Sequence, residues 1–261
     1  MMRYVLVIIM VLSLSLATSC VNDESHVIVS GSTSVQPYIE ILAEEYGHLH
    51  PEQVIDVQGG GSSAGIMAVE SGIADIGMSS RMLKEDEQHL WVIEIAKDGL
   101  AMIIHPKNPV SDLSLAQVRG VYTGEITSWR ELSGNDAKIH IIAREEGSGT
   151  RSAFEDLVMG ESRISPRAIV QSSNGAVRQL VSGDPNSIGF ISLGLVDQTV
   201  KAVKLDGVAA TNDNVTNGSY SLFRPFLFIA AKEPTGNSAD FIEYILSPEG
   251  KQHMINEGLV P

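Results

Sequence analysis

Four stretches of the chain share one pattern, in which a short apolar run leads into a loop of small polar residues and then into apolar residues at helical spacing. The apolar runs are residues 26–30, 54–58, 138–143 and 168–170. After the first run, Tyr38, Ile41 and Leu42 recur at the spacing that places side chains on one face of a helix. Strands that alternate with helices in this way predict an α/β fold with a largely parallel sheet.

Two further apolar runs separate the middle of the chain from its flanks. They are residues 100–105 and 222–230, and each contains or adjoins a proline. We expect them to carry the chain from one lobe to another, where a cleft is a common place for a ligand. The predicted organisation is a signal segment at 1–19, a first lobe at 20–104, a second lobe at 105–221 and a return to the first lobe at 222–261.

The N-terminus has the pattern of an export signal. Arg3 precedes an apolar run over residues 4–16, and small residues at 17–19 stand just before Cys20, the only cysteine in the chain. One cysteine cannot form a disulfide within the chain, and this box resembles the cleavage site of secreted lipoproteins. We therefore interpret Cys20 as a lipid-bearing mature N-terminus that anchors an extracytoplasmic protein to the membrane, at the cell surface or in the periplasm. An uncleaved membrane anchor is the alternative.

Composition narrows the class of protein. Hydrophobic residues make up 43% of the chain and charged residues 19%, which is typical of globular proteins rather than disordered ones. The 18 Lys and Arg residues are outnumbered by 32 Asp and Glu, and the formal net charge of -14 argues against nucleic acid as a partner. The one close pair of histidines, His48 and His50, has no evident third ligand nearby, so we expect no metal or other cofactor.

The loops between the predicted strands and helices can bind an anion. The first turn of a helix leaves backbone N–H groups without acceptors, and glycine and hydroxyl residues there allow close approach and add donors. A single loop of this kind is commonly only a helix cap, but parallel strands bring several such loops to one edge of a sheet. The third loop also contains Arg144, which can bind two oxygens of a tetrahedral oxyanion, and Glu146 could hold its guanidinium in place. A surface ion pair is the alternative for these two residues.

The second loop permits a different interpretation. Residues 61–65 read G-x-S-x-G between a strand and a helix, as in the nucleophile elbow of a serine hydrolase. Ser63 would be the nucleophile, and Asp240 and His253 follow in the order that such an enzyme requires. This alternative leaves Arg144 and the first loop without a role.

Taken together, the loops resemble those of the PstS family, the phosphate-binding proteins that serve phosphate ABC transporters. The matching stretches cover nearly all of the chain after Cys20: residues 31–37, 60–65, 74–81, 126–129, 147–150, 186–191 and 247–250. The resemblance implies an α/β, two-lobed periplasmic-binding-protein fold of type II, with the ligand in the cleft between the lobes. It also implies inorganic phosphate as the ligand, the permease of an ABC importer as a partner, and no enzymatic activity.

The resemblance also implies which residues hold the anion. In this chain they are Thr33, Ser34, Ser62, Arg144, Ser148, Gly149 and Thr150, with Ser63 as a neighbouring addition. Glu146 matches the acidic residue that orients the arginine. Well-known family members have an aspartate that accepts the proton of bound phosphate, and the corresponding residue here is Ser80, which carries no charge to repel sulfate. Sulfate or another tetrahedral oxyanion therefore stays an alternative ligand, and Arg81 is either a second cation in the cleft or a solvated loop residue.

Overall fold

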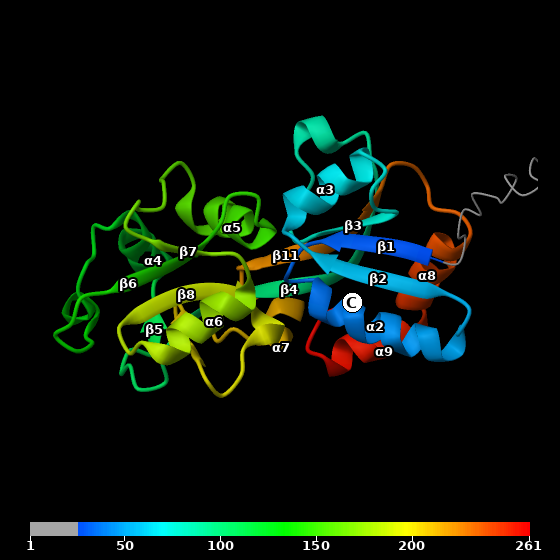
Figure 1. Ribbon diagram of the computed structural model, residues 1–261. Coiled ribbons are helices and arrows are strands. Elements are labelled where there is room, and N and C mark those ends of the chain that lie inside the picture. The colour runs from blue at the N-terminus through cyan, green and yellow to red at the C-terminus, as the bar shows by residue number, and fades with distance from the viewer. Residues whose placement is uncertain (1–25) are drawn as a thin grey trace, which may run out of the picture.

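The structure is a computed structural model that describes residues 26–261, which form two α/β lobes joined side by side (Figure 1). The predicted α/β class is confirmed, and all four predicted strand–helix units are present. The predicted signal segment and Cys20 lie outside the described residues. Within the described part of the chain, no helix is long and apolar enough to cross a bilayer.

The sheet of the first lobe begins with three parallel strands. They are β1 (His26–Gly31), β2 (Val54–Gly59) and β3 (Ile76–Ser79). β11 (Phe223–Ala230) runs antiparallel between β3 and the first half of β4 (Trp91–Ile104), so the strand order is β2-β1-β3-β11-β4. All four residues of β3 are buried, because helices cover both faces of this sheet.

Four helices cover these faces. They are α2 (Gln36–Leu49), α3 (Ser62–Glu70), α8 (Asn237–Leu246) and α9 (Pro248–Asn256). α2, α8 and α9 pack their apolar side chains on one face, and α3 packs Ile66 and Val69 on the other (Figure 1). Ile73, which continues the apolar spacing of α3 in the sequence, is exposed because the helix ends at Glu70 and Gly72 then turns the chain with a φ of 69°.

The second lobe continues the sheet. The second half of β4 pairs with β8 (Ser187–Ser192), which is followed by β6 (His140–Arg144) and β7 (Ile169–Gln171). The remaining helices are α4 (Leu115–Thr123), α5 (Gly149–Phe154), α6 (Asn174–Gly183) and α7 (Asn212–Thr216). The short strands are β5 (Asp112–Leu113), β9 (Lys201–Ala202) and β10 (Lys204–Leu205), and the short turns of helix are Glu85–Glu87, Trp129–Leu132, Glu155–Met159 and Leu193–Leu195. The core of this lobe includes Phe154 and Phe190, whose rings stack with centroids 4.2 Å apart.

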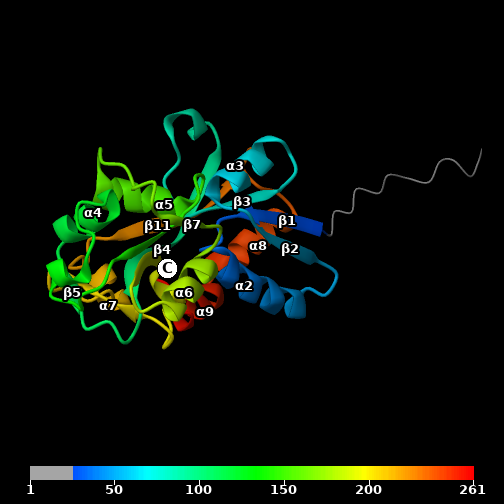
Figure 2. The ribbon, with the colours of Figure 1, turned by 60° about the vertical axis from the view of Figure 1, so that its left-hand side comes forward.

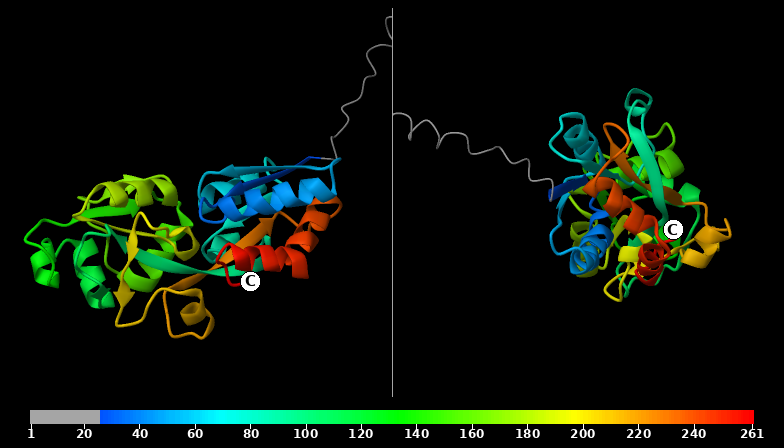
Figure 3. Two further views of the ribbon diagram at one scale, coloured as in Figure 1. Left: turned by 90° about the horizontal axis from the view of Figure 1, so that it is seen from below. Right: turned by 90° about the vertical axis from the view of Figure 1, so that its right-hand side faces the viewer.

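β4 and β11 connect the two lobes (Figure 3). They contain most of both apolar runs that were expected to carry the chain between lobes. β4 begins at Trp91, nine residues before the apolar run at 100–105. The sequence pattern did not reveal this first half of the strand, because exposed Glu94 and Lys97 interrupt its apolar residues. Its first half pairs with β11 and its second half, from Leu100 onward, pairs with β8. One strand therefore belongs to both lobes, and bending of these two strands can move one lobe relative to the other.

Gly65 lies where α3 approaches β1 most closely. A Cβ on Gly65 would lie 2.5 Å from the carbonyl oxygen of Ser30, and this backbone cannot move away without disturbing β1. We expect Gly65→Ala to lower the free energy of unfolding by about 1–3 kcal/mol. Gly47→Ala in α2 is the matched control, because a Cβ there meets nothing within 4 Å, and it should raise stability by about 0.4–1 kcal/mol. Chemical denaturation measures both, and equal stability of the two variants would contradict the packing argument.

Candidate functional site

The strand–helix loops meet where the two lobes face each other. Ser34 of the first loop and Thr150 of the third have their hydroxyl oxygens 2.8 Å apart. Asn174, from the fourth loop, donates from its side-chain amide to the Ser34 Oγ at 2.8 Å. All three side chains are buried. Residues that lie 116 and 140 positions apart in the chain thus form one polar cluster.

Arg144 ends β6 and points into this cluster with a side chain that is only 1% exposed. Its Nη2 donates to the Thr33 Oγ1 at 3.2 Å, and its Nη1 donates to the Thr150 Oγ1 at 3.5 Å. Nε and Nη2 also donate to the two carboxylate oxygens of Glu145, at 2.9 and 2.8 Å. This forked contact fixes the plane of the guanidinium. The structure therefore brings together Arg144, Thr33 and Thr150, which the sequence analysis assigned to one site.

The acidic residue that orients Arg144 is Glu145, and the prediction of Glu146 for this role is wrong. The Glu146 side chain is 92% exposed, and its carboxylate lies 3.9 Å from Arg151. The cause is the path of the backbone, because the Glu145 N–H still donates to a carbonyl of β7 at 3.2 Å. The loop then turns at Gly147, where φ is 89°, and this turn leaves Glu146 facing solvent.

Buried serines of the first lobe form the other side of the cluster. The Ser32 Oγ donates to the Ser80 Oγ at 2.8 Å, and the Ser80 N–H donates to the Ser62 Oγ at 3.1 Å. Gly149 packs directly against them, since a Cβ on it would lie 2.2 Å from the Ser62 Oγ. Ser148 caps α5, because its Oγ accepts an N–H from the first turn of that helix at 3.2 Å. Figure 2 shows that α3 and α5, which begin at these contacts, lie on the same side of the molecule.

Ser63 contacts the opposite lobe rather than the buried serines. Its N–H donates to the carbonyl of Gly147 at 3.1 Å, and its Oγ accepts from Arg81 Nη2 at 3.3 Å. Arg81 is buried and donates twice to the carboxylate of Glu87, each time at 2.7 Å. Hydrogen bonding to Arg81 holds the pKa of Glu87 below its usual range. The alternative of a solvated loop residue is therefore wrong for Arg81, and its role as a second cation in the cleft stays a prediction.

The residues of the hydrolase alternative do not come together. Ser63 belongs to the first turn of α3, on one face of the sheet of the first lobe. Asp240 in α8 and His253 in α9 belong to helices that cover the opposite face. A nucleophile needs its base within hydrogen-bond reach, and here the sheet lies between them. The triad hypothesis is therefore wrong.

The sequence analysis missed another buried guanidinium, that of Arg224. It lies in β11 opposite Asp98 of β4, and its Nε and Nη2 donate to one oxygen of that carboxylate at 3.0 and 2.9 Å. Nη2 also donates to the Ser34 Oγ at 3.0 Å, and Nη1 donates to the Ser80 Oγ at 3.3 Å. Arg224 is 3% exposed and Asp98 is 2% exposed. The available signal was Arg224 itself, a charged residue within an apolar run, because a buried charge needs a partner.

Burial and charge pairing have opposite effects on Asp98. Loss of solvent raises its pKa, and the positive charge of Arg224 offsets part of this rise. The second carboxylate oxygen accepts from the Ser192 Oγ at 2.7 Å. The Asp98–Arg224 pair is therefore a neutral, hydrogen-bonded unit at the place where β4 and β11 join the lobes.

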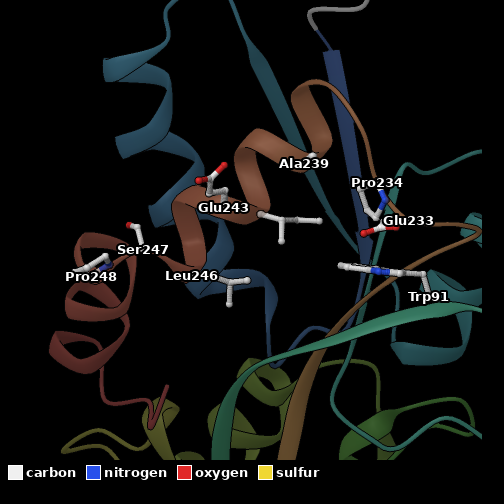
Figure 4. Close-up of a pocket in the computed structure, with 9 residues that line it drawn as sticks. Trp91, Glu233, Pro234, Ala239, Glu243, Leu246, Ser247 and Pro248 are labelled. Carbon is white, nitrogen blue, oxygen red and sulfur yellow. The ribbon is translucent and has the colours of Figure 1, made fainter.

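Neither a metal site nor the apolar pocket of the first lobe competes with the polar cluster as the place where an anion binds. Among residues 26–261, no three His, Cys, Asp or Glu side chains are grouped as metal ligands would be. The pocket has a volume of about 520 Å³ and lies between Trp91 and the junction of α8 and α9 (Figure 4). Its lining includes Glu233 and Glu243, whose carboxylates repel an anion. The polar cluster between the lobes is therefore the better anion site.

Known proteins match this chain along nearly its whole length. A family model described as a PBP superfamily domain matches residues 19–249. The phosphate-binding protein PstS of Bacillus subtilis (strain 168) is 30% identical over 239 residues, which cover 89% of this chain and 79% of that protein. The phosphate-binding protein PstS of Borreliella burgdorferi is 28% identical over 275 residues, which cover 99% of each chain.

Solved structures are similar over both lobes. A protein from Clostridium perfringens, described as a phosphate ABC transporter substrate-binding protein and solved with bound phosphate, is 45% identical with a TM-score of 0.88, and the match covers 90% of this chain and 98% of that one. An ABC-type phosphate transport receptor from Vibrio cholerae is 40% identical with a TM-score of 0.76, over 90% of this chain and 99% of that one. The predicted two-lobed periplasmic-binding-protein fold is thereby confirmed.

Gly149 provides a test of the contact between the lobes. A methyl group there would lie 2.2 Å from the Ser62 Oγ and 2.5 Å from the Ser80 Oγ, so Gly149→Ala should hold the lobes apart. Small-angle X-ray scattering should then give a larger radius of gyration than for the unmodified protein. Gly175→Ala is the control at the start of α6, because the nearest atom to its Cβ is 3.9 Å away. An unchanged radius for Gly149→Ala would show that the lobes do not meet at this residue.

Proposed function

Because the chain belongs to the PstS family of phosphate-binding proteins, within the PBP superfamily, we propose that it binds inorganic phosphate between its two lobes and delivers it to an ABC importer. The observation that carries the proposal is the convergence of loops from both lobes on Arg144, which is buried and oriented by Glu145. The phosphate bound in the related Clostridium perfringens structure supports the same ligand. Binding and delivery need no covalent step, so we assign no catalytic residue.

Phosphate would receive hydrogen bonds from both lobes. The donors that we assign to it are the hydroxyl groups of Thr33, Ser34, Ser62 and Ser80, the guanidinium of Arg144, and the first turn of α5 with Gly149 and Thr150. Ser148 acts by capping α5, and Ser63 acts by contacting the second lobe. A hydrogen bond to a charged group contributes about 1.5–3 kcal/mol, so several short contacts can outweigh the screened repulsion from a net charge of -14.

Binding of phosphate and closure of the lobes belong to one equilibrium in this proposal. The assigned donors stand on both sides of the interface, so a bound anion favours the arrangement in which the lobes touch. The hydrogen bond from Ser63 to Gly147 and the packing of Gly149 against Ser62 are contacts of that arrangement. A permease that recognises both lobes in this arrangement would select the loaded protein.

Arg144→Ala should weaken phosphate binding while the fold stays intact. The change removes charge-assisted hydrogen bonds of about 2–4 kcal/mol in total, or roughly 30- to 1,000-fold in Kd. Glu145→Gln should weaken binding less, because the guanidinium stays but loses its charged partner. Glu146→Gln is the matched control and should leave Kd unchanged, since this carboxylate faces solvent.

Isothermal titration calorimetry with inorganic phosphate measures these constants, and thermal melting checks the fold. An unmodified protein that does not bind phosphate would refute the proposed function. Tight binding by Arg144→Ala would refute the assigned site alone.

Export and lipid attachment complete the proposed function. A protein that delivers its ligand to a permease must stay at the outer side of the membrane, and a lipid on Cys20 would keep it there. Cys20→Ala should abolish incorporation of a labelled fatty acid and move the protein from the membrane fraction to the soluble fraction. Continued membrane association of that variant would favour an uncleaved N-terminal anchor instead.

A further inference from the structure

Arg224 has a position that binding through Arg144 alone does not explain. It lies in β11, one of the two strands that connect the lobes, and its side chain is almost fully buried. One edge of its guanidinium faces Asp98. The other donors reach the hydroxyl groups of Ser34 and Ser80, both of which belong to the proposed phosphate site. The contacts with Asp98 alone would be enough to neutralise that carboxylate, so the contacts with Ser34 and Ser80 need another explanation.

A closed ring of hydrogen bonds fixes the Arg224 guanidinium. From Arg224 the ring passes to Asp98, whose other oxygen accepts from the Ser192 Oγ. The Ser192 N–H donates to Asn174 Oδ1 at 3.3 Å. Asn174 then donates to Ser34, which accepts from Arg224 and closes the ring. The ring contains groups from both lobes and from both connecting strands, so the guanidinium has one orientation relative to the site.

Two hydroxyl groups link Arg224 to Arg144. Arg224 donates to the Ser34 Oγ, which lies 2.8 Å from the Thr150 Oγ1. Arg144 donates to that same threonine oxygen. Burial lowers the pKa of Arg224, and the positive charge of Arg144 lowers it further. Like charges held this close repel each other, and an anion between them removes the repulsion.

We propose that Arg224 binds the anion directly together with Arg144, and that the ligand is a tetrahedral dianion; this inference rests on the proposed phosphate-binding function. The carboxylates beside the two guanidiniums are already engaged, Asp98 with Arg224 and Glu145 with Arg144. Ser80 places a neutral hydroxyl where a carboxylate would repel a second negative charge. The site therefore favours the doubly charged form of phosphate over the singly charged form, and it admits sulfate.

The double variant Asp98→Asn with Arg224→Gln tests the role of Arg224. It removes both charges together, so no buried charge is left unpaired and the fold should persist. We expect the Kd for phosphate to rise by about 10- to 100-fold, because a charge-assisted donor is lost. The matched control is Arg130→Gln with Asp136→Asn, an exposed ion pair of the second lobe, which should bind as the unmodified protein does. Unchanged phosphate binding by the Asp98/Arg224 variant would show that Arg224 is only structural.

Arg224→Lys keeps the test valid if the double variant does not fold. Lysine retains the positive charge beside Asp98 but cannot donate from two edges at once. Melting at the temperature of the unmodified protein together with about tenfold weaker phosphate binding would support the proposal. Normal melting with normal binding would overturn it. If the unmodified protein binds neither phosphate nor sulfate, the proposed function itself fails, which is a different result.

Calorimetric titrations with phosphate and sulfate, between about pH 5.5 and about pH 8, test the ligand class. Phosphate affinity should rise with pH, because its second ionisation makes the dianion the main form. Sulfate is doubly charged throughout, so its affinity should stay constant. The charged and titratable groups that face the two guanidiniums are Asp98, Glu145 and Tyr38, and Arg151 donates to the backbone carbonyl of Arg144. Titration of any of these would change both anions alike, so a slope seen with phosphate alone belongs to the ligand.

Failure of sulfate to bind, or a phosphate affinity that does not rise with pH, would overturn the assignment of a dianion. The proposed function does not depend on either result, because it requires only that phosphate binds.

Discussion

Burial of positive charge is the constraint on which both the site and the connection between the lobes depend. A guanidinium that leaves water needs a carboxylate or several hydrogen-bond acceptors. Arg144 has Glu145 beside it at the end of β6, and Arg224 has Asp98 opposite it on β4. Because each pair is neutral, a protein with a net charge of -14 can keep two strong donors in its interior. Attraction for an anion then comes from local hydrogen bonds and not from the field of the whole molecule.

The two strands that position these donors also connect the lobes. β4 changes its pairing from β11 to β8 at Leu100, close to Asp98. The hydrogen bonds that continue from Asp98 to Ser192 and Asn174 lead into the second lobe. A change in the angle between the lobes must therefore change this set of bonds. Coupling between the ligand and closure needs no long pathway, because the buried charges already lie at the place where the chain bends.

The sequence analysis was most successful where a short segment decides its own structure. Ser34, Thr150 and Arg144 were expected in one site, and they meet because each ends or follows a strand whose carboxyl end faces the other lobe. The assignment of Glu146 failed by one residue, because whether the side chain faces Arg144 depends on where the loop turns. Arg224 was overlooked because its strand was treated as uniformly apolar, although an arginine in such a strand requires a buried partner.

By itself, the sequence determined the α/β class, the repeated strand–loop–helix units and the arginine at the end of β6. These features depend on periodicity and on residues that are neighbours in the chain. Only the tertiary structure decided that Arg224 pairs with Asp98, 126 positions away, and that Asn174 bonds to Ser34. The physical reason is that burial and charge pairing depend on distances through space, which no local pattern of hydrophobic and polar residues specifies.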